Sequence, residues 1–140
     1  MRRANGFTLL EALAGMALAG ILAGMGATRL PALISGLRAN GAAHDVATAI
    51  RLARGRARAG GHAVEVRFDA AGASVETRWQ GGATIETTRL PPGVTFAAMP
   101  ASGRILMNGI GSAQNGTVTL GAGTSHRDVI VNQRGRVRVQ

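Results

Sequence analysis

Glu11 is the only charged side chain in residues 7–28, and its position near the start of this apolar stretch suggests chemistry. At about 1.5 Å per residue, a helix of this length spans about 33 Å, close to the roughly 30 Å hydrocarbon core of a bilayer. A carboxylate in such a segment is costly unless it is paired. The presence of Glu11 in a membrane-length segment therefore calls for a specific explanation.

The three residue types of a hydrolytic triad occur within four positions of the sequence, as Ser125, His126 and Asp128. Triad members normally converge from separate segments, so TSHRD is predicted to be a polar turn. His44, His62 and His126 lie far apart and have no Cys or carboxylate at metal-ligand spacing. We expect a protein that is not an enzyme and has no metal site and no cofactor.

Arg134, Arg136 and Arg138 alternate in the carboxyl-terminal sequence QRGRVRVQ. On a strand they would share one face, about 6–7 Å apart, with Val137 and Val139 on the other face. Guanidiniums at this spacing can reach successive phosphates, which makes DNA binding one hypothesis. The alternatives are an edge strand whose charges prevent sheet aggregation and an assembly contact with an acidic neighbour.

The composition supports an anionic partner, because the 140 residues carry a formal net charge of +9. All basic residues are Arg, and there is no Cys to form disulfides or thiolate metal sites. Three Phe, one Trp and no Tyr argue against stacking on single-stranded bases as the main binding mode.

The apolar stretch predicts a transmembrane helix over residues 7–30, followed by an amphipathic continuation over residues 31–60. Pro31 is expected to kink or interrupt the helix, and the sequence AGG at residues 59–61 to end it. Arg2 and Arg3 precede the span, which favours a cytoplasmic amino terminus. Gly20 and Gly24 form a small-xxx-small pair that either packs against another helix or reflects the frequency of Gly in such helices.

The continuation of the helix has two distinct faces. Arg51, Arg54 and Arg58 of RLARGRAR share one, for which we favour a solvated surface over a binding patch. The other is apolar and consists of Ala42, Val46, Ala49, Ile50, Ala53 and Ala57.

Residues 61–140 change to a period of two, in short runs separated by Gly, Asn and Asp. The runs are HAVEVRF, ASVETRW, ATIETTRL, PPGVTFAAM, GRILMNG, GTVTLG, DVIVNQ and RGRVRVQ. They predict seven or eight antiparallel strands in a domain packed against the end of the helix. The predicted fold class is therefore α+β, with a long amino-terminal helix on an antiparallel sheet domain.

The sequence GFTLLEA at residues 6–12 resembles the processing motif of type IV pilins and type II secretion pseudopilins. A secretory signal peptide would also be basic and then apolar, but it would not need Glu11. The resemblance implies that a prepilin peptidase removes residues 1–6 by cutting between Gly6 and Phe7, and then N-methylates Phe7. It also implies that Glu11 pairs with the Phe7 amine of a neighbouring subunit and so sets the register of assembly.

The carboxyl-terminal half resembles minor pilins and pseudopilins of the GspH/FimT type, through SGRILMNGIGS and RDVIVNQRGRVRV. This implies a type IV pilin-like subunit of a type IV pilus or type II secretion system. It would be anchored once in the inner membrane, with its β domain in the periplasm, and would join other subunits in a filament, at assembly initiation or the tip. An alternative implied by Arg134, Gly135, Arg136 and Arg138 is DNA binding for uptake in natural transformation.

Overall fold

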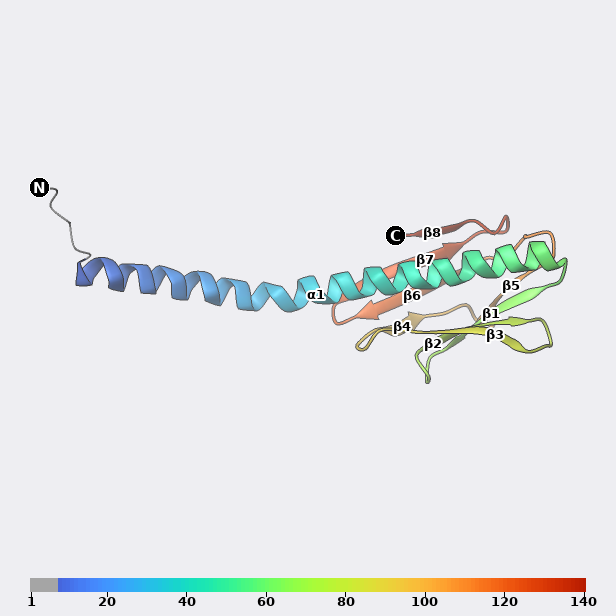
Figure 1. Ribbon diagram of the computed structural model, residues 1–140, viewed down its shortest axis with the longest axis horizontal. Coiled ribbons are helices and arrows are strands. Elements are labelled where there is room, and N and C mark those ends of the chain that lie inside the picture. Colours follow the sequence, from blue (N-terminus) through green and yellow to red (C-terminus); the bar gives the residue numbers. More distant parts are fainter. Residues whose placement is uncertain (1–7) are drawn as a thin grey trace, which may run out of the picture. The chain divides into compact units, whose positions relative to one another are not determined.

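The computed structural model describes residues 8–140, except for the side chains of residues 26–28. Within these residues one long helix, α1 (Leu9–Gly60), precedes eight short strands (Figure 1). Contacts divide the chain into a unit that ends at Ile34 and a second unit, Ser35–Gln140. The boundary falls inside α1, so the helix contributes to both units.

α1 continues through Pro31, so the predicted interruption at this residue is wrong. Proline lacks an N–H group and removes one hydrogen bond from the helix, a loss that a long helix tolerates when its other bonds remain. The end at Gly60 confirms the prediction. Gly61 follows with φ +65, the left-handed conformation that commonly terminates helices and that glycine adopts without a steric penalty.

The strands form two antiparallel sheets of four strands each. Their order is β3-β2-β1-β5 in the first sheet and β4-β6-β7-β8 in the second. The bounds are β1 (Val64–Asp69), β2 (Ser74–Trp79), β3 (Thr84–Arg89), β4 (Thr95–Ala98), β5 (Arg104–Met107), β6 (Gly116–Ala122), β7 (Ser125–Val131) and β8 (Val137–Val139). Each of the eight alternating runs in the sequence contributes one strand, which confirms the predicted antiparallel domain.

The sequence TSHRD was predicted to be a polar turn, but only Thr124 lies in a turn, and the other four residues are the first part of β7. The β6–β7 hairpin closes at the pair Ala122 and Ser125. Only Gly123 and Thr124 lie between them, and Gly123 supplies the positive φ (+56) of the tight turn. The reversal is therefore complete before Ser125, and the polar residues after it pair with β6.

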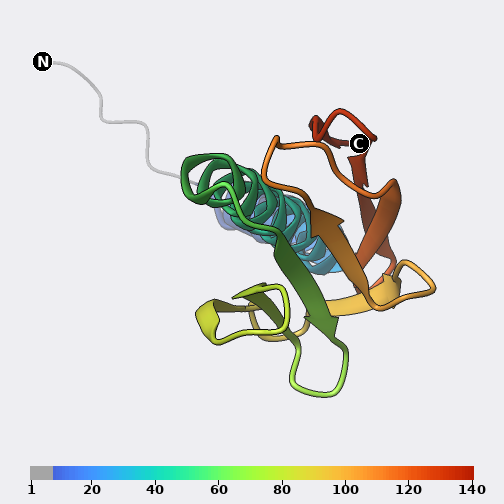
Figure 2. The ribbon, with the colours of Figure 1, turned by 90° about the vertical axis from the view of Figure 1, so that its right-hand side faces the viewer.

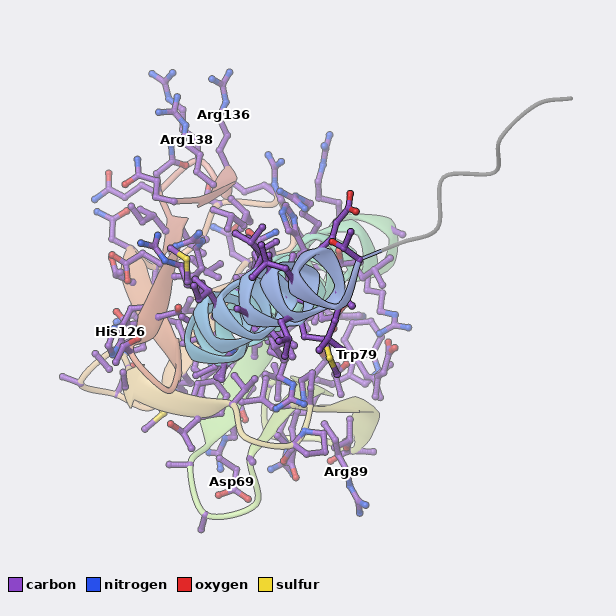
Figure 3. All side chains as sticks on the ribbon, turned by 90° about the vertical axis from the view of Figure 1, so that its left-hand side faces the viewer. Asp69, Trp79, Arg89, His126, Arg136 and Arg138 are labelled. Atoms are coloured by element: carbon purple, nitrogen blue, oxygen red, sulfur yellow. The ribbon has the colours of Figure 1, made fainter. Side chains whose placement is uncertain are left out.

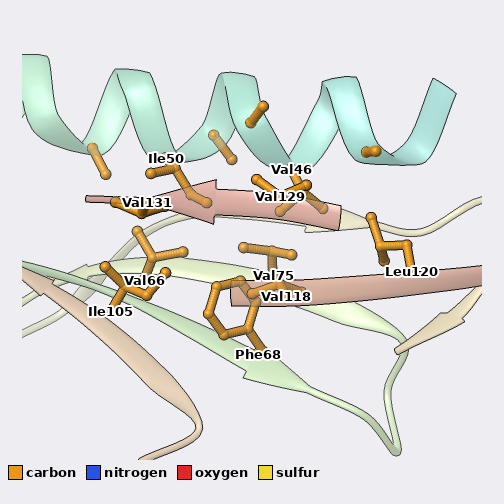
Figure 4. Close-up of a cluster of buried hydrophobic side chains, with 14 of the residues drawn as sticks. Val46, Ile50, Val66, Phe68, Val75, Ile105, Val118, Leu120, Val129 and Val131 are labelled. Atoms are coloured by element: carbon orange, nitrogen blue, oxygen red, sulfur yellow. The ribbon is translucent and has the colours of Figure 1, made fainter. Parts of the chain in front are cut away.

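The core lies between the second part of α1 and the two sheets, which wrap around one side of the helix (Figure 2). All six residues of the predicted apolar face of the helix are buried. Most of them are Ala, whose small side chain lets the backbone of α1 approach the strands closely. The larger side chains that fill the space are Val46, Ile50, Val66, Phe68, Val75, Ile105, Val118, Leu120, Val129 and Val131 (Figure 4).

Ile50→Ala is expected to lower the free energy of unfolding of fragment 35–140 by about 2–5 kcal/mol, because Ile50 is fully buried and its loss leaves a cavity. Urea unfolding would measure the change. Leu52→Ala on the same helix is the control, since Leu52 is 48 % exposed. Equal losses for the two variants would contradict the position of the core.

Candidate functional site

The first turn of α1 places Glu11 in a local hydrogen-bonding arrangement that the sequence reasoning did not anticipate. Thr8 precedes the helix, and its side-chain Oγ1 accepts a hydrogen bond from the Glu11 backbone N–H at 3.3 Å. The same N–H also lies 3.1 Å from the Thr8 carbonyl oxygen. Thr8 and Glu11 have the T-x-x-E spacing of a capping box, in which Thr is the N-cap. Gly6 and Phe7 lie outside the described residues.

Every described side chain of the unit ending at Ile34 is exposed. The large apolar ones include Leu9 at 82 % and Leu10 at 79 % exposure. α1 is long and apolar enough to cross a membrane. At Gly20 and Gly24, apart from the adjoining residues and the nearby helix backbone, no described atom lies within 4 Å of the position that a Cβ would occupy. The apolar surface of this unit must therefore be covered by lipid or by other chains.

The carboxyl-terminal arginines lie on a turn and a short strand. β7 ends at Val131 and β8 begins at Val137, so Arg134 lies in the turn and the prediction that it shares a strand with Arg138 is wrong. The cause is Asn132, whose side-chain Oδ1 accepts the backbone N–H groups of Arg134 (3.1 Å) and Arg136 (2.9 Å). Arg136 and Arg138 do project to the same side (Figure 3), as expected from their spacing.

Gly135 joins this turn to the loop that contains Gly111. Gly135 is buried and has φ +70. A Cβ there would lie 2.5 Å from the Gly111 carbonyl oxygen and 2.6 Å from Nε of Arg54. Gly111 is equally close to the helix, because its own Cβ would lie 2.6 Å from Cδ of Arg58. The two glycines allow the turn, the loop and α1 to meet without side chains between them.

Arginines of RLARGRAR, for which the sequence favoured a solvated face, contact the carboxyl-terminal part of the chain. Arg51 donates from Nη2 to the Val137 carbonyl oxygen at 3.3 Å, and Arg54 donates from Nε to the Gly111 carbonyl oxygen at 2.9 Å. The helix arginines are thus neighbours of the carboxyl-terminal turn. Their spacing on one helix face is visible in the sequence, whereas the turn that lies beside this face is not. We call the group Arg51, Arg54, Arg58, Arg134, Arg136 and Arg138 the basic surface.

Within the described residues, all ion pairs lie outside the basic surface. Arg56 contacts Glu86 at 2.7 Å. The buried Glu65 is surrounded by three guanidiniums: Arg67 at 2.9 Å, Arg104 at 3.0 Å and Arg78 at 3.8 Å. In residues 35–140, the seven arginines outside the basic surface stand against six carboxylates, so their charges nearly cancel. The basic surface thus gathers six of the thirteen arginines of this unit, and none of the six has an ion pair within the described residues.

A hollow of about 340 Å³ adjoins the basic surface. It is lined by Asn115, Asn132, Gln133, Arg134 and Arg136. Amide and guanidinium groups together offer several hydrogen-bond donors to an anionic ligand.

Ser125, His126 and Asp128 do not form a catalytic arrangement. Neighbouring strand residues point to opposite faces, which separates Ser125 from His126 on β7. Ser125 Oγ lies 3.4 Å from Ser35 Oγ, and Asp128 accepts a hydrogen bond from Thr119 Oγ1 at 2.7 Å. In residues 8–140, no three His, Cys, Asp or Glu side chains are grouped so that they could hold a metal ion.

Comparison with protein families gives two matches. Residues 1–27 match the prokaryotic N-terminal methylation motif, and residues 42–135 match the family of the type II transport protein GspH. A comparison with curated proteins found no match.

Two solved structures share the fold. The type IV minor pilin FimU of Pseudomonas aeruginosa has a TM-score of 0.62 at 14 % identity, over 73 % of this chain and 87 % of FimU. The minor pseudopilin EpsH from the type 2 secretion system of Vibrio cholerae has a TM-score of 0.58 at 17 % identity, over 74 % of this chain and 96 % of EpsH. These likenesses confirm the predicted pilin-like α+β fold.

Gly135→Ala is expected to destabilise fragment 35–140 through positive φ, which costs about 1–3 kcal/mol, and through overpacking, which adds about 1–3 kcal/mol. Gly103→Ala is the matched control, because Gly103 has φ +63 but no atom within 4 Å of a Cβ. Thermal unfolding of both variants isolates the packing cost. If Gly103→Ala cost as much as Gly135→Ala, the close contact of the turn with Gly111 and Arg54 would be refuted.

Proposed function

Because the chain belongs to the GspH family of type II transport proteins, whose members are structural pilin-like subunits, we propose that it helps to start or cap a type IV pilus or pseudopilus. The observation that carries this proposal is the exposed apolar unit of α1 beside a unit that has a complete core of its own. Such a chain needs lipid before assembly and other helices after it. The fold that it shares with the minor subunits FimU and EpsH supports a minor role.

Processing creates the mature amino terminus in this proposal. Prepilin peptidase cuts between Gly6 and Phe7 and methylates Phe7, in agreement with the N-terminal methylation motif that matches residues 1–27. Residues 1–6 are then the leader, residues 7–30 the membrane anchor, residues 31–60 its helical continuation and residues 61–140 the β domain.

Membrane orientation follows from the charges that flank the anchor. Arg2 and Arg3 keep the amino terminus in the cytoplasm, so the β domain enters the periplasm. The chain therefore begins as a single-pass protein of the inner membrane and leaves the bilayer when it enters the filament.

Glu11 sets the register between neighbouring subunits in the filament. Its carboxylate pairs with the amine of Phe7 in a neighbour, since a charge among packed apolar helices is tolerated only when it is paired. Gly20 and Gly24 allow the two helices to approach closely.

Glu11→Gln is expected to reduce incorporation into filaments at least about tenfold, because removing one partner of a buried ion pair costs about 3–5 kcal/mol. Gln is also accepted at this position of a capping box, so the start of the helix is preserved. The measurement is the amount of mature subunit in sheared filaments of a host whose own copy is deleted. Amino-terminal sequencing should find Phe7 as the first residue of the unmodified protein and of the Glu11→Gln variant.

Thr8→Ala is the control for this experiment, since it removes the cap, worth about 1 kcal/mol, and keeps the carboxylate. It should enter filaments nearly as well as the unmodified protein. Equal loss for Thr8→Ala and Glu11→Gln would mean that Glu11 acts through the helix start alone. A mature protein that began after an Ala-x-Ala sequence would refute processing at Gly6.

A second function is DNA binding through Arg134, Gly135, Arg136 and Arg138. The observation that favours it is the excess of unpaired arginines on the basic surface, where Gly135 shapes the turn that presents Arg134 and Arg136. The side-chain amide of Asn132 holds this turn in place. Arginine guanidiniums in this arrangement can contact phosphate oxygens without reading the base sequence.

The double variant Arg136→Ala/Arg138→Ala is expected to bind duplex DNA more weakly at about 50 mM salt and to reduce the slope of log K against log salt by about 2. Fluorescence anisotropy of fragment 35–140, which contains all buried core residues of the described chain, measures both quantities. Arg89→Ala is the control, because Arg89 projects to the opposite side (Figure 3). Unchanged binding by the double variant would end the DNA hypothesis.

A further inference from the structure

Two arginine-rich segments that are far apart in the sequence form one surface. RLARGRAR belongs to α1, and QRGRVRVQ contains the last turn and β8. We propose that Arg51 and Arg58 of α1 bind phosphates of the same DNA duplex as Arg136 and Arg138, while Arg54 holds the two segments together. This inference rests on the second function proposed above.

The helix arginines form a stripe that the contacts fix against the turn. Arg51, Arg54 and Arg58 are spaced i, i+3 and i+7, so they follow one side of α1 over about 10.5 Å. Arg51 reaches the carbonyl oxygen of Val137 in β8. Arg58 packs its aliphatic stem close to Gly111, the residue that also meets Gly135. The stripe and the turn therefore lie next to each other on one continuous surface.

The three helix arginines have different parts in the site. Arg54 is only partly exposed, and it binds the Gly111 carbonyl oxygen, so it is a positioning residue. Arg51 and Arg58 are exposed. The bond from Arg51 to Val137 uses one of the five N–H donors of its guanidinium, which leaves the others for phosphate oxygens.

The chemistry of the surroundings favours a duplex over single-stranded DNA. Trp79 packs edge-on with His62 near the end of α1, and Phe68 packs against Phe96 in the core at 5.8 Å. None of these rings belongs to the basic surface, so unpaired bases have no aromatic platform there. Contacts to the phosphate backbone, whose charge density is higher in a duplex, must supply the affinity.

The surroundings also favour nucleic acid over a lipid surface. The hollow beside Arg134 and Arg136 is lined by the amide side chains of Asn115, Asn132 and Gln133. These groups can hydrogen-bond to phosphates or base edges. Ile110 is the one large exposed apolar side chain in the adjoining described loop, Asn108–Ser112. Peripheral membrane binding normally requires a broader apolar face.

The test is a binding titration of the full-length chain in a nonionic detergent, with a short DNA duplex and its separate single strand as probes, over a range of salt. Arg51→Gln and Arg58→Gln should each weaken duplex binding roughly tenfold at about 50 mM salt and reduce the salt slope by about 1. Arg89→Gln removes the same charge from the opposite side and should leave binding unchanged. Arg58→Lys keeps the stem and the charge and should bind like the unmodified chain. Arg58→Met keeps an unbranched apolar stem without the charge and should bind as weakly as Arg58→Gln, which a purely structural role of the stem would not predict.

The outcomes separate this inference from the function on which it rests. Loss of binding in Arg136→Ala/Arg138→Ala without loss in Arg51→Gln or Arg58→Gln would overturn the composite surface and leave the DNA function intact. No duplex binding by the unmodified chain would overturn both. Tighter binding of the single strand would overturn the assignment of a duplex.

Vesicles of phosphatidylglycerol and phosphatidylcholine provide the remaining comparison. This arm uses fragment 35–140 without detergent, because the apolar first part of α1 would itself enter vesicles. If Arg51→Gln and Arg58→Gln reduced binding of this fragment to the vesicles and not to the duplex, the surface would be a lipid site and the inference would be overturned.

Discussion

The close packing of the alanine-rich face of α1 against two sheets is the constraint on which the rest of the structure depends. Ala42, Ala53 and Ala57 are fully buried, so the helix backbone lies near the strands along its second part. That proximity brings the arginines of the adjoining helix face within hydrogen-bonding distance of β8 and the Gly111 loop. Larger residues on the buried face would hold the sheets away and would separate these groups.

One helix therefore satisfies two opposite requirements. Its second part belongs to a unit whose apolar groups are covered by the same chain, while every described side chain up to Ile34 is exposed. The buried core of the described residues lies within Ser35–Gln140, so the first part remains available for the lipid and helix contacts that the proposed function assigns to it. Thr8 caps the helix at its start, so the first turn keeps its hydrogen bonds in either environment.

The sequence predicted those features that depend on local periodicity. The buried face of α1, the eight strands and the end of the helix at Gly60 all follow from spacing and from glycine. It did not predict the division into two sheets or the approach of Arg54 to Gly135, because both depend on pairings between segments distant in sequence. The three local errors, at Pro31, at Arg134 and at TSHRD, arose where a single residue or a two-residue turn decided how far a helix or strand extends.

The same contrast between local features and contacts of distant segments applies to the candidate sites. Glu11 and the arginines near the carboxyl terminus were recognisable from residue type and spacing, since an isolated carboxylate and alternating guanidiniums stand out in the sequence. The contributions of Arg51 and Arg58 were not recognisable, because a basic helix face is usually only solvated. The contact of Arg51 with Val137 and the close approach of Arg58 to Gly111 place them beside the turn.

The arrangement around Glu65 has a consequence for how the molecule meets other charges. Glu65 lies among Arg67, Arg78 and Arg104, whereas within the described residues no carboxylate pairs with an arginine of the basic surface. Six arginines without an ion pair in the described residues are thus gathered on one surface of the domain. In the field of a polyanion it experiences a torque that turns the basic surface forward before contact, which shortens the rotational search. Screening limits this effect to roughly 8–10 Å at physiological ionic strength, so the domain is oriented only in the last step of its approach.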